Sequence, residues 1–506
     1  MDNPRTLARN MIWNWAGLAL GMAAGFVVMP FLIRRLGETN YGLWVLIGSL
    51  TSYFGLLDLG VRGSIGRFIA LHRARGDQEA VNATLSTSMA ILGTLAFLAV
   101  VGVLALVVVF FQLFEVSPDE VANVRLALVI VGLNLALSFP FSLFDAILWA
   151  YQRFDLLNAI DIPTILVRTV LTFALIDGEG DLVTLAVLTL LSAVLNAAAK
   201  AVASYYLDRG LRIKVGLVRR EMAGALFGYG FWHFLLTVTV LVSGQMSLLI
   251  VGAMLSVGLV TVYSIAHRLV GIAGAFLNAV TGVLTPVATT NHAEDQAERQ
   301  QDLFIAGGKY CLALGLFFWG FFFFLGQSLL LLWLGSEQSG AAELLILMAS
   351  GLILPMSQRV THSILLGMGR HKVIALVGVA ESFAGTILAL AVAGRFGLIG
   401  VCLAFVACEF VCRGVIQAMY TCRLLGVSYR RYVVNALTPP LIAAVLPTLG
   451  LAGVTWFWMP ATWPQLILAT GVFSLIFLGS CVLFLNAGLG LRHGVFPTFG
   501  TVPKEA

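Results

Sequence analysis

Long apolar runs without a charged residue recur along almost the whole chain, and one of them extends from Ile91 to Phe111. A helix needs about 20 consecutive apolar residues to cross a bilayer. These runs lack the apolar–polar alternation of a membrane-spanning strand. Of the 506 residues, 59% are hydrophobic and only 11% are charged, whereas soluble domains have about 25% charged residues. We therefore predict an all-α polytopic membrane protein.

The lengths of the apolar runs predict about fourteen transmembrane helices. We place them at residues 11–33, 41–61, 84–111, 126–150, 157–177, 182–207, 224–250, 258–284, 307–334, 342–366, 372–394, 398–422, 432–458 and 463–487.

A weak internal repeat relates the two halves of the chain. Tyr41, Phe54 and Gly60 recur 222 residues later as Tyr263, Phe276 and Gly282. The copies start an even number of spans apart and so point the same way, which predicts two six-helix lobes in parallel repeat around a central cavity, plus two C-terminal helices. We expect an N-terminal lobe at 1–207, a cytoplasmic linker at 208–223, a C-terminal lobe at 224–423, and spans 13 and 14 with a cytoplasmic tail at 424–506.

Basic residues gather in the loops that follow even-numbered spans. Four arginines follow the second span between residues 62 and 75, and five basic residues lie in the 208–220 linker. The loop at 177–181, after an odd-numbered span, has three acidic residues and no basic one. Loops rich in Lys and Arg face the cytoplasm. Both termini are therefore expected in the cytoplasm, and Arg34, Arg35, Arg125 and Arg395 are exceptions to the pattern.

Motifs of catalysis and nucleotide hydrolysis are missing from the sequence. It has no G-x-x-x-x-G-K-[ST] loop, no H-E-x-x-H helix and no nucleophile elbow. We therefore expect no ATP hydrolysis by this chain, no catalytic residues, no enzyme activity and no cofactor. Cys408 and Cys412 share a helix face without a matching His pair, which favours packing over a metal site. The net charge of +5 follows the sidedness of the loops and does not indicate nucleic-acid binding.

Several cations fall within predicted spans, where a charge needs a partner, a cavity or a ligand. Arg268 and Arg359 have no acidic residue within one helical turn, and His267 and His362 lie close to them in the chain. A guanidinium stays charged when buried and binds phosphate oxygens bidentately. We predict that these four residues contact an anionic ligand in the cavity, with Arg34 at the outer end of the first span. The alternative is that Arg359 and Arg34 reach lipid headgroups.

For the other charged residues within spans, a structural ion pair and ligand binding are equally open interpretations. Glu409 and Arg413 stand four residues apart and are placed to pair on one helix. Asp161 and Arg168 lie two turns apart, where a neighbour can link them. Lys200 is close enough to a span end to extend towards the cytoplasmic surface.

The N-terminal region resembles the polysaccharide transporter family of the MOP (multidrug/oligosaccharidyl-lipid/polysaccharide) superfamily, especially Wzx-type flippases. The similarity rests on Pro30, the L-G-x-x-x-Y-G-L-W run from Leu36 to Trp44, the L-L-D-L-G run from Leu56 to Gly60, and the R-F-I-A run from Arg67 to Ala70. In architecture, with two six-span lobes plus two spans, the resemblance extends over the whole chain.

This resemblance implies a bacterial inner-membrane flippase that moves an undecaprenyl-diphosphate-linked oligosaccharide outwards by alternating access. It implies cavity cations for the diphosphate or acidic sugars, and frequent coupling to an ion gradient, for which Asp58, Asp145 and Glu381 are the candidates. Membrane lipids, a polysaccharide polymerase and glycosyltransferases are the further expected partners. The same three acidic residues keep a cation-coupled multidrug exporter open as an alternative. A peptidoglycan-precursor flippase is also open, as is a polymerase or ligase enzyme, which usually needs a larger outward loop.

Overall fold

The computed structural model describes residues 4–58, 60–178, 181–335 and 340–486. Every regular element in these ranges is a helix, which confirms the all-α class. Contacts divide the chain into two compact units, residues 1–261 and 262–506. The boundary between them falls within helix α8 (Val257–Gly282). The predicted lobe limits at 207 and 424 stay predictions.

Eleven helical stretches in the described ranges are long and apolar enough to cross a membrane. A bent pair, Gly340–Gly351 with Ile353–Gly367, adds a twelfth when it is counted as one span. Two of the eleven, Trp15–Asp58 and Lys372–Leu424, contain 44 and 53 residues. Both are about twice as long as one crossing requires.

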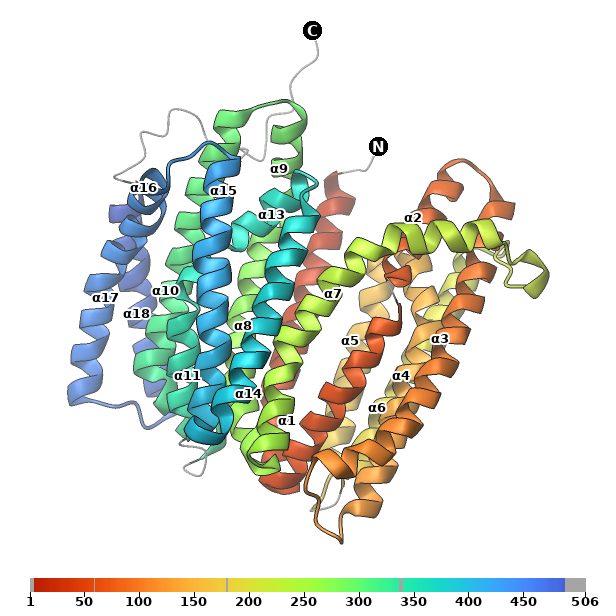
Figure 1. Cartoon of the computed structure of the whole chain (residues 1–506), viewed down its shortest axis with the longest axis horizontal. Helices are drawn as coiled ribbons and strands as arrows, with labels where there is room; N and C mark the ends of the chain where they lie inside the picture. Colours follow the sequence, from red (N-terminus) through yellow and green to blue (C-terminus); the bar gives the residue numbers. More distant parts are fainter. Residues whose placement is uncertain (1–3, 59, 179–180, 336–339, 487–506) are drawn as a thin grey trace. The chain divides into compact units, whose positions relative to one another are not determined.

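Each of these two long stretches bends back at a glycine (Figure 1). Gly37 has φ 77° and Gly397 has φ 55°. Glycine adopts this left-handed conformation readily because it has no Cβ. With the bent pair counted as one span, there are twelve stretches. Dividing two of them at these glycines gives fourteen, the number of crossings that the sequence predicts.

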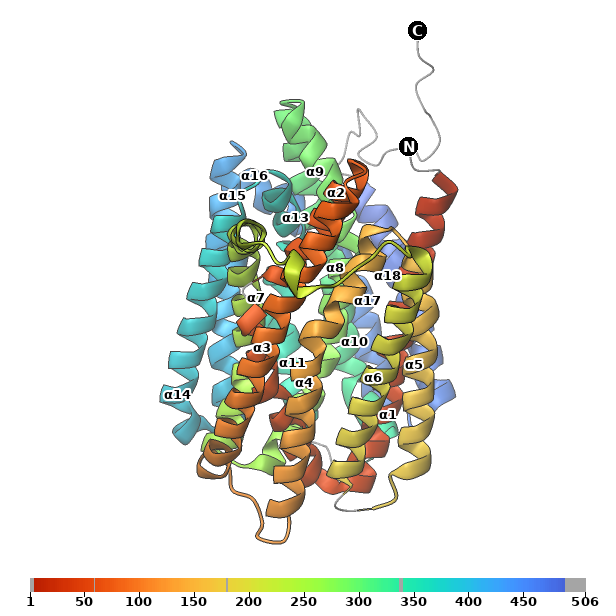
Figure 2. The same ribbon diagram turned by 90° about the vertical axis from the view of Figure 1, so that its right-hand side faces the viewer.

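Unit 1 consists of the first seven α-helices with their connections and the start of α8. Its elements are α1 (Pro4–Tyr53), η1 (Phe54–Asp58), α2 (Val61–Ala74), α3 (Gln78–Leu113), α4 (Val121–Ala150), α5 (Phe154–Leu175), α6 (Leu182–Leu207), η2 (Val215–Leu217) and α7 (Arg220–Met254). Helix α4 packs between α3 and α6, while α5 packs against α6 and α1 (Figures 1 and 2).

The apolar core of unit 1 lies where α2 crosses α3 and α4. On α2, Val61, Ile65 and Ile69 recur every four residues and are fully buried. This spacing places the three side chains on one face of the helix. They pack in one cluster with residues such as Leu92 of α3 and Phe139 of α4. Arg67 and Arg73 of the same helix are exposed, whereas Arg62 is half-buried.

The basic linker is held against the first turns of α3. The side-chain amide of Asn82 donates to the carbonyl of Gly210 at 3.0 Å, and its oxygen accepts the N–H of Arg212 at 2.9 Å. The hydroxyls of Ser86 and Thr87 accept N–H bonds further along the linker. Side chains at these positions of α3 therefore satisfy the backbone groups of an extended segment.

Unit 2 is built around the long helix α10. Its elements after α8 are α9 (Leu284–Ala293), α10 (Ala297–Leu334), α11 (Gly340–Gly351), α12 (Ile353–Ser357), α13 (Arg359–Gly367), α14 (His371–Glu409), the π-helix η4 (Phe410–Gln417), α15 (Ala418–Leu424), α16 (Tyr429–Tyr432), the π-helix η5 (Val433–Leu437), α17 (Thr438–Phe457) and α18 (Trp463–Asn486).

Helix α10 packs against α11, α12, α13, α17 and α18, so the last two helices dock on the body of unit 2. The buried ammonium of Lys309 on α10 donates to the carbonyl of Leu485 at 2.7 Å. A cation near a helix C-terminus is stabilised by the helix dipole. Lys309 thus ties the end of α18 to α10.

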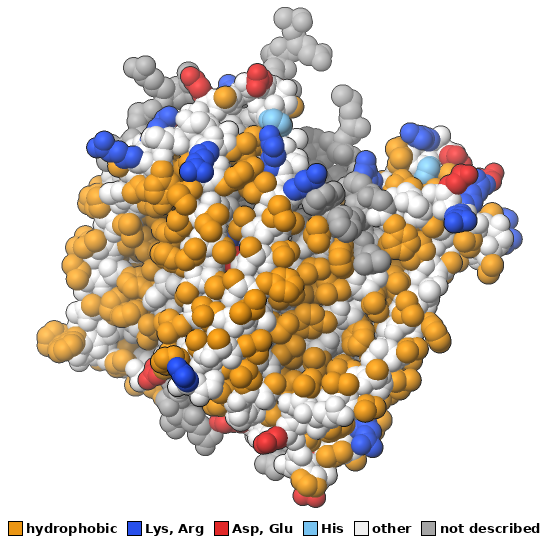
Figure 3. Space-filling view, in the orientation of Figure 1, with side chains coloured by type: hydrophobic (Ala, Val, Ile, Leu, Met, Phe, Trp, Pro, Cys, Tyr) orange, Lys and Arg blue, Asp and Glu red, His pale blue; other side chains and the backbone are white. Residues whose placement is uncertain are grey.

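The outward faces of the helices are apolar, as a bilayer requires. Phe97 on α3 is 67% exposed, and Leu376 and Leu475 in unit 2 are exposed to a similar extent. On the face seen in Figure 3, hydrophobic side chains cover the middle of the helices, and most Lys and Arg lie near helix ends. The chain is a multi-pass membrane protein.

Candidate functional site

Unit 1 contains a polar cavity of about 530 Å³ within its membrane-spanning helices. Its walls come from α1, α2, α4, α5 and α6. The polar lining comprises Arg62, Asn134, Ser138, Ser142, Asp145, Asn158, Asp161, Thr164, Arg168, Thr189, Ser192 and Asn196. This volume lies in the range of small-molecule sites. Polar and charged groups among membrane-spanning helices are costly, which makes this cavity a candidate functional site.

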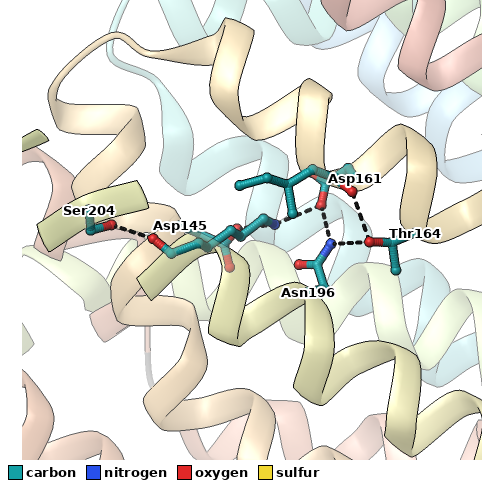
Figure 4. A network of polar contacts seen from close by, with 7 residues as sticks. Asp145, Asp161, Thr164, Asn196 and Ser204 are labelled. Carbon is teal, nitrogen blue, oxygen red and sulfur yellow. Dashed lines mark hydrogen bonds and ion pairs between the residues drawn. The ribbon is translucent and has the colours of Figure 1, made fainter. Parts of the chain in front are cut away.

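The largest charged cluster at this cavity joins three helices (Figure 4). The ammonium Nζ of Lys200 on α6 lies 2.6 Å from Oδ1 of Asp145 on α4 and 2.8 Å from Oδ1 of Asp161 on α5. The side-chain amide of Asn196 donates to Asp161 at 2.8 Å and to the Thr164 hydroxyl at 3.2 Å. The sequence analysis suggested that Lys200 extends towards the cytoplasmic surface. In the structure its ammonium instead bonds to two carboxylates among the helices.

The guanidinium group of Arg168 lines the cavity and has no ion-pair or hydrogen-bond partner among the residues that the structure describes. Its suggested partner Asp161 lies two turns earlier on α5 and bonds to Lys200 and Asn196 instead. The sequence analysis placed Arg168 among structural pairs and therefore missed it as a candidate ligand-binding residue. Its position near the middle of an apolar run was the available signal.

Arg62 forms the α2 side of the cavity. Its guanidinium Nη2 donates to the Ser138 hydroxyl at 3.1 Å, and its Cζ lies 4.5 Å from the centre of the Phe139 ring. Its backbone N–H donates to Asp58 Oδ1 at 3.1 Å, and its Nε lies 3.7 Å from Asp58 Oδ2. Asp58, a predicted ion-coupling residue, is therefore the partner of a cavity arginine.

In unit 2, Glu381 on α14 and Arg413 in η4 form a second charged cluster. Arg413 Nε donates to Glu381 Oε2 at 2.5 Å, and the Glu381 side chain is buried. The sequence suggested that Arg413 pairs with Glu409, but the ion pair goes to Glu381 on the neighbouring helix. All three predicted ion-coupling carboxylates, Asp58, Asp145 and Glu381, thus already face a basic side chain.

Arg359 and Arg268 lie at separate levels of unit 2. Arg359 begins α13, is half-buried, and donates from Nη1 to the Asn278 side chain of α8 at 3.4 Å. Arg268 is exposed on α8 and has no ion-pair or hydrogen-bond partner in the described part of the chain. Asn278 follows Arg268 by ten residues, or roughly 15 Å along a helix. The two arginines therefore do not form one compact site.

The remaining predicted ligand residues flank these two arginines or lie in unit 1. His267 is half-buried and its ring stacks on Tyr263 with centroids 6.3 Å apart. His362 is exposed on α13. Arg34 is exposed three residues before the bend at Gly37. Its neighbour Arg35 donates to the backbone carbonyl of Asp177 at 3.2 Å.

Among the residues that the structure describes, no group of three or more His, Cys, Asp or Glu side chains is arranged to bind a metal ion. The intramembrane chemistry of the described chain is therefore that of ion pairs, amides and hydroxyls around cavities.

Residues 7–292, more than half of the chain, match the sequence family described as polysaccharide biosynthesis protein. The chain belongs to this family. Within curated proteins it is 22% identical over 476 residues to the uncharacterized membrane protein EpsK of Bacillus subtilis, covering 92% of each chain. It is also 22% identical over 436 residues to a putative O-antigen transporter of Shigella flexneri, covering 82% of this chain and 98% of the relative.

Two solved structures share the fold of this member of the polysaccharide biosynthesis family. The lipid II flippase MurJ in an inward closed conformation aligns with a TM-score of 0.66 at 14% identity, over 95% of this chain and 99% of MurJ. An inward-facing MATE family multidrug transporter of the MOP superfamily aligns with a TM-score of 0.65 at 16% identity, over 79% and 97%. The fold expected from the resemblance to the MOP superfamily is confirmed.

Proposed function

We propose that this protein is a flippase that moves an undecaprenyl-diphosphate-linked oligosaccharide across the bacterial inner membrane by alternating access. The product serves cell-surface or exopolysaccharide synthesis. Membership of the polysaccharide biosynthesis family, the O-antigen transporter relative and the fold shared with the lipid II flippase support this function. We infer no enzyme activity, because these relatives transport their substrates and the sequence lacks catalytic motifs.

The observation that carries the proposal is the polar cavity of unit 1. Its hydroxyl and amide groups suit the many hydroxyls of a glycan, and Arg168 offers a cation that no described residue neutralises. A hydrophilic cargo loses its water on entering such a space, so the wall must replace those hydrogen bonds. An apolar cargo would gain nothing from this lining.

The diphosphate and its lipid are assigned to the predicted cations of unit 2 and of the first bend. In this proposal Arg268 and Arg359, assisted by His267 and His362, contact the headgroup at different levels, because α8 separates them by roughly 15 Å. Arg34, at the outer end of the first span, contacts the headgroup where it is released. Release requires that binding weakens in the outward-facing state, because a ligand favours the state to which it binds more tightly.

A cation-coupled drug exporter is the second candidate, favoured by the fold shared with the MATE transporter. The ion pairs argue against it. Cationic drugs need uncommitted carboxylates, whereas Asp58, Asp145 and Glu381 each hold a basic side chain. We therefore rank the glycolipid flippase first.

The test uses purified protein in proteoliposomes with a fluorescent undecaprenyl-diphosphate-linked oligosaccharide on one leaflet, without ATP. We expect the label to reach the opposite leaflet. Arg268→Ala and Arg359→Ala should each abolish this movement while leaving protein abundance normal, and lysine at either position should restore part of it, because the charge remains but the fork is lost. Arg395→Ala, which removes an exposed arginine of α14, is the matched control. Normal activity of both alanine variants would refute the cationic site, and no movement by the wild type would refute the flippase.

A further inference from the structure

The position of Lys200 between Asp145 and Asp161 is unusual for an interhelical salt bridge. One ammonium needs one carboxylate for neutrality, yet two carboxylate oxygens lie 2.6 and 2.8 Å from Nζ. With both carboxylates ionised, these three groups carry one formal negative charge, and the cavity beside them also holds the guanidinium groups of Arg62, which attracts Asp145, and of Arg168. Lys200 thus has one carboxylate more than a one-to-one ion pair requires.

The surroundings of the two carboxylates match a site for a small hard cation. Such ions take carboxylate, amide and hydroxyl oxygens as ligands. Asp145 and Asp161 approach from two different helices, and the Asn196 amide orients Asp161 through its 2.8 Å hydrogen bond. Figure 4 shows Thr164 and Asn196 beside Asp161.

The exposure of the three side chains shows which side of the site is open. The side chains of Asp145 and Asp161 are 50% and 40% exposed and line the cavity, whereas that of Lys200 is 8% exposed and does not line it. Lys200 therefore reaches the carboxylates from the protein wall. The oxygens stay open to the cavity, and the ammonium supplies the positive charge that they require.

We propose that Asp145 and Asp161 form a monovalent-cation site that the chain keeps filled with the tethered ammonium of Lys200. Unit 1 therefore needs no Na⁺ or K⁺ for its stability, and a metal ion binds there only when the lysine is removed. This inference goes beyond the flippase proposal and does not depend on the cargo. It also changes the role of Asp145 from a ligand of a free coupling ion to a ligand of Lys200.

The test is the unfolding midpoint of the purified full-length protein in detergent, followed by tryptophan fluorescence in NaCl, KCl or choline chloride at equal ionic strength. We expect the wild type to give the same midpoint in all three salts. Lys200→Met keeps the length of the side chain and removes its charge, which leaves two facing carboxylates. Its midpoint should fall in choline and rise saturably with Na⁺ or K⁺, because a ligand of the folded state stabilises it.

Two further variants keep the test decisive. Lys200→Met/Asp161→Asn retains the net charge of the wild-type cluster and replaces the single variant if the latter does not fold; it should still respond to Na⁺ or K⁺, more weakly. Lys200→Met/Asp145→Asn/Asp161→Asn should not respond at all. Lack of a salt response in both lysine variants would overturn the proposal in favour of an ordinary ion pair. A wild-type response to Na⁺ or K⁺ that Asp145→Asn removes would overturn it as well, because the site would then bind a metal ion beside the lysine.

Discussion

Arg413 Nε lies 2.5 Å from Glu381 Oε2, although the two residues are 32 positions apart. The bend at Gly397 makes this contact possible, because it turns the chain back so that η4 packs beside α14. Both side chains lie within a long apolar stretch of unit 2. The pair therefore connects the two arms of a membrane hairpin.

Neutralising one side of this pair is expected to destabilise unit 2. Glu381→Gln leaves the guanidinium of Arg413 without its charge partner, and breaking a buried pair costs roughly 3–5 kcal/mol. The unfolding midpoint of the purified variant in detergent measures the effect. The reversed pair Glu381→Arg/Arg413→Glu should regain part of the loss, whereas equal destabilisation of the single and reversed variants would show that the charges do not interact.

Arg168 is expected to contribute to cargo movement. Arg168→Gln removes the unmatched cation of the unit 1 cavity, and the loss of a hydrogen bond to a charged group should slow glycolipid movement in proteoliposomes by about tenfold or more. The rate of glycolipid movement by Arg168→Lys should lie between those of the wild type and Arg168→Gln. Arg395→Gln is the matched control in unit 2. A wild-type rate for Arg168→Gln would exclude this cavity from the cargo path.

The hydrogen bond from Tyr151 Oη to Asp208 Oδ2, at 2.5 Å, should hold the linker against unit 1. Tyr151→Phe is expected to speed tryptic cleavage at Arg212 by about tenfold, because a bond to a charged group is lost and the segment opens more often. Tyr206→Phe is the control, since that ring is 82% exposed. Equal cleavage of the two variants would contradict the role of Tyr151.

The same bond predicts a pH dependence of stability. Burial raises the pKa of Asp208, but hydrogen bonds from Tyr151, the Gly210 N–H and Gln78 outweigh it and hold that pKa below its ordinary value. The ionised Asp208 therefore contributes to the free energy of unfolding above about pH 4, its pKa in the unfolded chain. This contribution is lost as the pH falls through the pKa of Asp208 in the folded protein. Burial and the bond to Asp208 raise the pKa of Tyr151. The stabilisation from its protonated hydroxyl is therefore lost only in the alkaline range, as the pH rises through the raised pKa of Tyr151. Asp208→Asn should flatten the acid limb of the midpoint-versus-pH curve, and an unchanged limb would assign acid sensitivity to other groups.

The sidedness of unit 1 can be tested with single cysteines in a background whose six native cysteines are replaced by alanine. Val215 in the linker is 91% exposed, and Glu115 is exposed in the loop between α3 and α4. We expect Val215→Cys to react with an impermeant maleimide only after spheroplasts are opened, and Glu115→Cys to react in intact spheroplasts, because basic loops stay in the cytoplasm. The reverse pattern would invert the predicted topology.

The sequence alone was sufficient for the class, the number of crossings and the family of this protein. Apolar runs of membrane length can satisfy their backbone groups in lipid only as helices, so composition and run length determine the architecture. Gly37 and Gly397 did not stand out among 52 glycines, because a positive φ is a property of the folded chain. The loops that they form were nevertheless visible as gaps between apolar runs.

Charge partners were decided by the tertiary structure alone. Sequence spacing suggested Glu409 for Arg413, a link from Asp161 to Arg168, and a surface position for Lys200, because only neighbours along one helix are visible in a sequence. In the fold, Lys200 meets Asp145 from 55 positions away, and Arg413 meets Glu381. Helix packing and rotation set which side chains face each other, and a buried charge takes the partner that packing brings within reach. The roles of Arg268 and Arg359 stay predictions, while the unmatched charge of Arg168 became visible only once its expected partner was seen to bond elsewhere.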